Sequence, residues 1–82
     1  MENETNLNVL RLYTVYANPS DYPGQFVVRG FSILPGGRQE VDQEATLVCT
    51  DYVDVETEMM GRGLVKLMRD PSDDPCIVET WL

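Results

Sequence analysis

Alternation of side-chain types predicts two long strands in the first half of the chain. From Asn8 to Ala17 the sequence NVLRLYTVYA puts β-branched and aromatic residues on both alternating sets, which is typical of a strand covered on both faces. Gln25–Leu34, QFVVRGFSIL, has the same character. Its Gly30 predicts a bulge or a close approach of another group to the backbone. Together the two segments predict a long antiparallel hairpin.

The connection between these strands, Asn18–Gly24, consists of turn-forming residues. Pro19 disfavours helical backbone at the residue before it, so Asn18 is expected to be extended, whereas Gly24 is free to take a positive φ. Seven residues are many for a hairpin connection, which predicts a shaped loop. Tyr22 either packs this loop onto the sheet or serves as a recognition residue at its tip.

Shorter elements are predicted in the second half. Gln39–Glu44 is a polar, acidic connection, and Ala45–Thr50 is a short strand. The segment 64–68, LVKLM, suits either a helix extension or a strand, and we favour a strand because it follows a glycine pair. The turn-rich loop 70–75 then leads into a last strand at Cys76–Leu82, CIVETWL.

One short helix is predicted between these strands. Thr50 or Asp51 supplies its N-terminal cap. Gly61 and Gly63 end it, because a helix rarely continues through two glycines. Its apolar residues form a narrow stripe of Val53, Met59 and Met60.

These elements predict an α+β fold, an antiparallel sheet of four or five strands with one short helix on a face. Residues 1–7 are expected to be a flexible polar leader, and 8–82 a single domain with a small core, since 82 residues support no more. No apolar run exceeds five residues, and the polar, acidic N-terminus does not resemble a signal peptide. We therefore expect a cytoplasmic protein.

Charge and residue types limit the chemistry. A net charge of −8 disfavours direct binding to nucleic acid or to anionic membranes, although it permits a basic partner. The chain has no histidine, and neither cysteine has an adjacent base, so the usual nucleophile–base pairs are missing. We expect a protein that is not an enzyme and has no cofactor.

The cysteines and the acidic loop do not predict a metal site. Cys49 and Cys76 each lie in an apolar, strand-like run without the spacing of zinc ligands, so free and buried thiols are expected. Asp70, Asp73 and Asp74 lack the alternating ligands, central glycine and terminal glutamate of a calcium loop.

Two stretches carry a resemblance. LYTVYANPSDYPGQFVVR near the start and GLVKLMRDPSDDPCIVETWL at the end resemble small proteins of bacteria and of their phages and prophages, which share a DYPG turn with FVVR and a terminal DDP-IVETW stretch. The resemblance covers most of the chain from Leu12 onward. The chain departs from it at Gly61-Arg62-Gly63, where a proline is expected before the glycine. The resemblance implies no catalytic residues, and a phage setting implies a protein that binds and blocks a host machine, such as a defence system.

Acidic and aromatic side chains are the candidates for binding a partner. Asp51, Asp54 and Glu58 share one side of the predicted helix, where they form either a solvated face or a surface that occupies a basic groove in place of phosphate. Trp81 either closes the core from the last strand or belongs to an exposed aromatic patch. The tyrosines of such a patch are Tyr13, Tyr16 and Tyr22.

We therefore expect a small acidic binding protein, a phage-type inhibitor of a bacterial host protein with a basic surface that acts in defence or nucleic-acid handling. One alternative is a sponge that holds a small ligand or nucleotide at an oligomer interface, which requires Arg11, Arg29 and Arg38 to share one face. Another is a small enzyme that uses Asp and Tyr side chains in a cleft. A homodimer is also expected, formed by edge pairing or by packing of aromatic faces, because the first and last strands lack edge-blocking residues.

Overall fold

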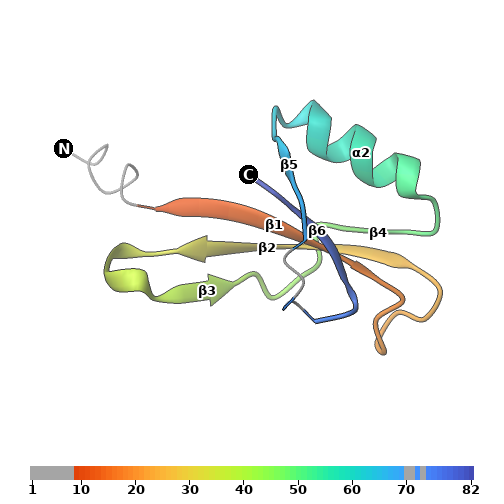
Figure 1. Ribbon diagram of the computed structural model, residues 1–82, viewed down its shortest axis with the longest axis horizontal. Coiled ribbons are helices and arrows are strands. Elements are labelled where there is room, and N and C mark those ends of the chain that lie inside the picture. Colours follow the sequence, from red (N-terminus) through yellow and green to blue (C-terminus); the bar gives the residue numbers. More distant parts are fainter. Residues whose placement is uncertain (1–8, 70–71, 73) are drawn as a thin grey trace.

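The computed structural model describes residues 9–69, 72 and 74–82, which form a six-stranded sheet with one α-helix on one face (Figure 1). Every strand pair is antiparallel, so the predicted α+β class is confirmed. The predicted leader 1–7 lies outside the described residues, as do Asp70 and Asp73. In the part of the chain that is described, no helix is long and apolar enough to cross a bilayer.

The predicted hairpin is the centre of the sheet. Strand β1 (Leu10–Ala17) pairs with β2 (Phe26–Ile33) along the whole length of both, in an unbroken register from Leu10 with Ile33 to Ala17 with Phe26. On its other side, β1 pairs with the last strand, β6 (Ile77–Trp81). The chain therefore brings its first and last strands together in the middle of the molecule.

Three short strands complete the sheet. β3 (Gln39–Val41) and β4 (Leu47–Cys49) share the outer edge of β2, and β5 (Lys66–Leu67) pairs with β6 on the opposite side. The segment 39–44 was expected to be a connection, so β3 corrects that prediction. All three β3 residues are exposed, and they follow a 3-10 turn, η1 (Pro35–Gly37). An exposed three-residue strand has no buried positions that would mark it in the sequence.

The hairpin loop is held by Asn18. Its φ is +54°, so the expectation of extended backbone at this residue is wrong. The Asn18 side chain accepts a hydrogen bond from Gly24 N at 2.7 Å, and its backbone N donates to Gln25 O at 2.8 Å. Asparagine tolerates this left-handed conformation, and the bond across the loop stabilises it. Gly24 has the predicted positive φ, +75°.

Helix α2 (Tyr52–Gly61) begins and ends as predicted. The Asp51 side chain accepts a hydrogen bond from Val53 N at 3.1 Å, which caps the first turn. Gly63, at φ +78°, follows the helix in the left-handed conformation that commonly ends one. Leu64 N then donates to Met59 O at 3.2 Å, which satisfies a carbonyl of the last turn.

The predicted apolar stripe of α2 is wrong in two of its three members. Val55 and Met59 are fully buried, whereas Val53 and Met60 are 55% and 64% exposed. Val55 and Met59 are four residues apart, so they project from one side of the helix towards the sheet. The other two apolar residues lie on the solvent side and contribute nothing to the core.

The core lies between α2 and the sheet. Val15 and Val28, which are cross-strand partners, pack with Val55, Met59 and Trp81. Full burial of each such side chain contributes roughly 1.5–3 kcal/mol. Phe26 and Tyr52 extend the contact in an edge-to-face arrangement, with ring centroids 5.6 Å apart. Cys49 and Cys76 are free, as expected, but half-buried rather than buried.

Gly30 shows the close approach that its position predicts, without a bulge. A Cβ at this residue would lie 2.5 Å from Arg11 Nη2 and 2.8 Å from Asp42 Oδ2. These two side chains form an ion pair of 2.9 Å that crosses directly over the glycine. The absence of a side chain at position 30 therefore makes room for a link between β1 and the loop after β3.

Gly30→Ala is expected to lower the free energy of unfolding by about 1 kcal/mol, because the added methyl group displaces the Arg11–Asp42 pair. Gly61→Ala is the matched control. Nothing lies within 4 Å of a Cβ at Gly61, and alanine favours the helix, so this variant is expected to be as stable as the parent or slightly more. Urea unfolding measures both. Equal stability of Gly30→Ala and the parent would contradict the close approach.

Candidate functional site

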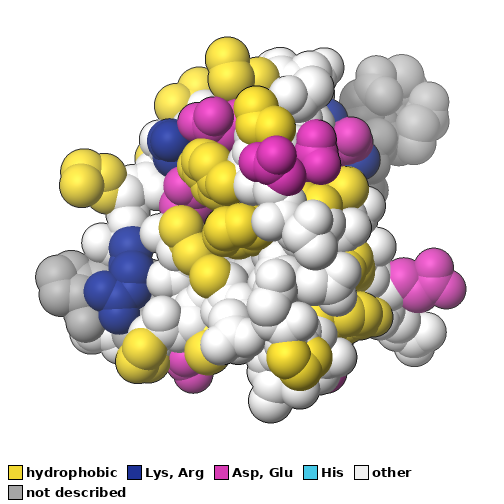
Figure 2. All heavy atoms as spheres, turned by 90° about the vertical axis from the view of Figure 1, so that its right-hand side faces the viewer, with side chains coloured by type: hydrophobic (Ala, Val, Ile, Leu, Met, Phe, Trp, Pro, Cys, Tyr) yellow, Lys and Arg dark blue, Asp and Glu magenta, His cyan; other side chains and the backbone are white. Residues whose placement is uncertain are grey.

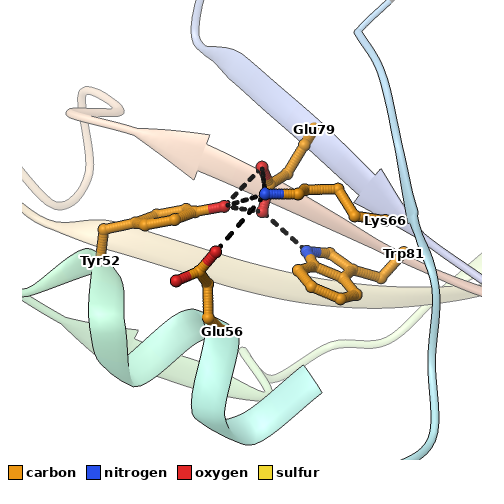
Figure 3. Close-up of polar contacts among 5 residues, drawn as sticks. All are labelled: Tyr52, Glu56, Lys66, Glu79 and Trp81. Atoms are coloured by element: carbon orange, nitrogen blue, oxygen red, sulfur yellow. Dashed lines mark hydrogen bonds and ion pairs between the residues drawn. The ribbon is translucent and has the colours of Figure 1, made fainter. Parts of the chain in front are cut away.

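A polar network connects α2 to the sheet (Figure 3). At its centre is the carboxylate of Glu79, whose residue is only 5% exposed. Glu79 pairs with Val15 across β6 and β1, so it projects to the face of the sheet that α2 covers. A buried carboxylate is costly unless donors surround it, which makes its partners the decisive feature.

Glu79 is surrounded by donors from three elements. Tyr52 Oη lies 2.7 Å from both of its carboxylate oxygens, and Trp81 Nε1 donates to Oε2 at 2.7 Å. Lys66 Nζ lies 3.9 Å from Oε1 and 3.2 Å from Tyr52 Oη, and it reaches Glu56 at 3.5 Å. The Lys66 ammonium also lies over the rings of Tyr52 and Trp81. The network thus links the start of α2 to β5 and β6.

Burial and hydrogen bonding shift the pKa values of two groups in this network. Burial and, secondarily, the hydrogen bond to Glu79 raise the pKa of the Tyr52 phenol above its ordinary value. The hydrogen bond to Tyr52 raises the pKa of the Lys66 ammonium. Both shifts favour the protonated forms, in which Tyr52 donates to Glu79 and Lys66 donates to Tyr52 and pairs with Glu79. This arrangement is suited to holding the helix on the sheet. The signal that could have revealed it is Glu79 itself, a lone charge inside the apolar stretch CIVETWL.

The three arginines of the ligand-sponge alternative do not converge. Arg11 and Arg29 occupy positions of opposite parity in the β1–β2 register, so they project to opposite faces of the sheet. Arg11 donates to both oxygens of Asp42, at 3.0 and 2.9 Å, and this hydrogen bonding raises the pKa of Arg11 and lowers that of Asp42. Arg29 donates to the backbone oxygen of Gln43 at 3.2 Å. Arg38 lies exposed beyond the 3-10 turn.

The aromatic patch is not formed either. Trp81 is 3% exposed and belongs to the core, so its expected role as a partner contact is corrected. Tyr13 and Tyr16 point to opposite faces of the sheet, because side chains alternate along β1 and the two residues are three positions apart. Tyr22 is half-buried in the hairpin loop, where its backbone N donates to Pro19 O at 3.0 Å.

The three carboxylates proposed for partner binding have different tasks. Asp51 caps α2, so its side chain is engaged with the backbone. Glu58 forms an ion pair of 2.9 Å with Arg62, one turn further along. Asp54 is exposed in the first turn, and its carboxylate has no ion-pair or hydrogen-bond partner among the described residues.

An exposed apolar stripe accompanies these carboxylates on the solvent side of α2. Figure 2 shows acidic side chains gathered over the helix, interleaved with hydrophobic ones. Val53, Thr57 and Met60 follow one another at helical spacing, with Asp54 and Glu58 on the adjacent row. We call these five residues the outer face of α2.

The opposite side of the sheet, the helix-free face, has no cover from α2. Its β1 and β2 side chains form the cross-strand pairs Leu10 with Ile33, Leu12 with Phe31, Thr14 with Arg29 and Tyr16 with Val27. Two adjoining hollows of about 140 and 290 Å³ share Tyr16 and Arg29 in their walls. The smaller one extends to Asp21 in the hairpin loop, and the larger one to Val41 of β3 and Ile77 of β6.

Among the described residues, no group of three or more carboxylate, thiol or imidazole side chains is arranged to hold a metal ion. Comparison of the chain with family models, with curated proteins and with solved structures gives no match.

Tyr52→Phe is expected to lower the free energy of unfolding by about 1–3 kcal/mol at neutral pH, because the buried Glu79 loses a donor. The effect depends on pH. Since folding raises the pKa of Tyr52, its contribution is present below the phenol's unfolded pKa of about 10 and is lost as the pH rises through the folded value. The stability difference between parent and variant should therefore shrink in alkaline solution.

Urea unfolding between neutral and alkaline pH measures this difference. Tyr22→Phe removes a hydroxyl outside the network and serves as the matched control, with an expected change below about 0.5 kcal/mol. If Tyr52→Phe were as stable as the parent at neutral pH, the network would not hold the helix.

Proposed function

We propose that this chain is a small, non-enzymatic binding protein that docks the outer face of α2 onto a basic surface of a partner protein. The observation that carries the proposal is the pairing of an exposed apolar stripe with carboxylates on one side of a short helix. Val53 is 55% exposed and Met60 is 64% exposed, because both lie on the side of α2 that faces away from the sheet. Helices that present apolar anchors at this spacing bind in grooves of partner proteins.

Charge defines the partner's surface. Asp54 and Glu58 flank the stripe on a chain with a net charge of −8, so the complementary groove has an apolar floor and a rim of Lys or Arg. Such charge acts mainly on the association rate and is screened by salt. Asp54 is the carboxylate of first importance here, because Asp51 caps the helix and Glu58 is paired with Arg62.

The biological setting of the proposal comes from the resemblance to phage and prophage proteins. An acidic helix that occupies a basic groove excludes the phosphates that the groove would otherwise bind. We therefore propose inhibition of a host defence or nucleic-acid-handling protein in the bacterial cytoplasm. The sponge alternative is weakened by the divergence of Arg11 and Arg29. The enzyme alternative gains nothing from Glu79, since its carboxylate is already engaged by Tyr52 and Trp81.

Asp54→Lys and Val53→Glu are each expected to weaken the partner complex by at least about tenfold, the first by charge reversal and the second by placing a charge on the apolar anchor. Quantitative affinity capture from bacterial lysate at low and moderate salt measures the retained proteins. Capture by the parent is expected to fall as salt rises.

Glu44→Lys is the matched control, because it makes the same charge change at an exposed residue of the loop before β4. A partner counts as specific if Glu44→Lys retains it and Asp54→Lys loses it. If both α2 variants bind as tightly as the parent at low salt, the outer face of α2 is not the contact.

A further inference from the structure

The helix-free face differs in charge from the rest of this acidic molecule. Along the described strands, the positions that alternate to this face are apolar or uncharged, except for Arg29. The two carboxylates within strands, Glu40 and Glu79, alternate to the opposite face. Asp21, which lines a hollow beside Arg29, comes from the hairpin loop. Although the chain has a net charge of −8, no strand carboxylate projects to the helix-free face in the described residues.

Large apolar side chains on this face remain in contact with solvent. Val41 is 61% exposed, Leu10 45%, Leu67 42% and Val48 36%. The strand register places them on the same side of the sheet, although they come from four different strands. Thr14 and Val27 of the same face are already buried within the chain, so the exposed apolar residues lie around them. Large exposed apolar areas commonly mark interaction sites.

The size of the face suits a specific interface. Eight-residue strands are about 26 Å long, and four rows of strands are about 19 Å across, which gives roughly 500 Å² for one sheet face. Two such faces in contact bury about 1,000 Å², the lower bound for a specific protein interface.

We infer that a second copy of this chain covers the helix-free face, with the two sheets packed face to face about a two-fold axis. Two copies with a charge of −8 each repel one another, and the carboxylate-poor face is where they approach with the least repulsion. In this arrangement the apolar side chains of both sheets form one layer, as in a β-sandwich. Both α2 helices then lie on the outside.

Pairing through sheet edges is a poor alternative. The strands that were expected to be open edges are internal, because β1 lies between β2 and β6, and β6 lies between β1 and β5. The actual edge strands are short, with three residues in β3, three in β4 and two in β5. Edges this short offer few backbone hydrogen bonds to a second copy.

The test compares two valines on opposite sides of the molecule by sedimentation equilibrium across the micromolar range. Val41→Glu places a carboxylate in the proposed interface and is expected to raise the dimer dissociation constant at least about tenfold. Val53→Glu makes the same change on the outer face of α2 and should leave the dimer intact. Since salt screens the repulsion between acidic copies, the parent dimer is expected to tighten as salt rises.

Leu67→Glu, on another strand of the same face, provides a second interface variant, and circular dichroism checks that each variant is folded. A parent that stays monomeric overturns the inference. A dimer that survives both Val41→Glu and Leu67→Glu, or that Val53→Glu dissociates equally, also overturns it. The proposed function is tested separately, because Val53→Glu is expected to lose the partner protein and keep the dimer.

Discussion

One helix cannot cover this sheet, and most features of the molecule follow from that limit. The ten residues of α2 are about 15 Å long, whereas the eight-residue strands β1 and β2 extend about 26 Å. Both strands carry apolar side chains on both faces. The positions beneath the helix, Val15 and Val28 among them, become a dry core. On the helix-free face Val27 is also buried, whereas other apolar side chains, such as Leu10 and Val41, stay exposed.

A small core also makes the position of the helix sensitive to single contacts. Val55 and Met59 are the only fully buried residues that α2 contributes within the described chain. The Glu79 network adds directional bonds that two aliphatic contacts lack, because a carboxylate flanked by Tyr52 and Trp81 accepts only at defined positions. The packing of Val55 and Met59 determines the distance between helix and sheet. The hydrogen bond from Tyr52 to Glu79 determines which part of β6 lies beside the start of α2.

The sequence predicted the elements whose signals are local. The β1–β2 hairpin follows from alternation over ten residues, and the limits of α2 follow from Asp51 and the glycine pair around Arg62. It did not predict β3, whose residues are all exposed, nor the choice of Val55 over Val53 as the buried residue. That choice depends on where the sheet lies relative to the helix.

The candidate site was harder to predict, because its contacts join distant parts of the chain. Asp51, Asp54 and Glu58 share a helix as expected, yet only the structure shows that a cap and an ion pair occupy two of them. The sequence allowed Trp81 to be either a core residue or part of an exposed aromatic patch. Because it pairs with Tyr13 on the face that α2 covers, it is a core residue. The partners of Glu79 lie on other elements, which a pattern along one strand cannot specify.

The pairing of β1 with β6 has a kinetic consequence. It joins Tyr13 to Trp81, so the central strand of the sheet acquires its second neighbour only through contacts between residues far apart in the sequence. Closing so long a loop costs entropy before any contact compensates it, which makes this step slow compared with formation of the local β1–β2 hairpin. During folding, the hairpin can form early, whereas the core beneath α2 is complete only after β6 has brought Trp81 to β1.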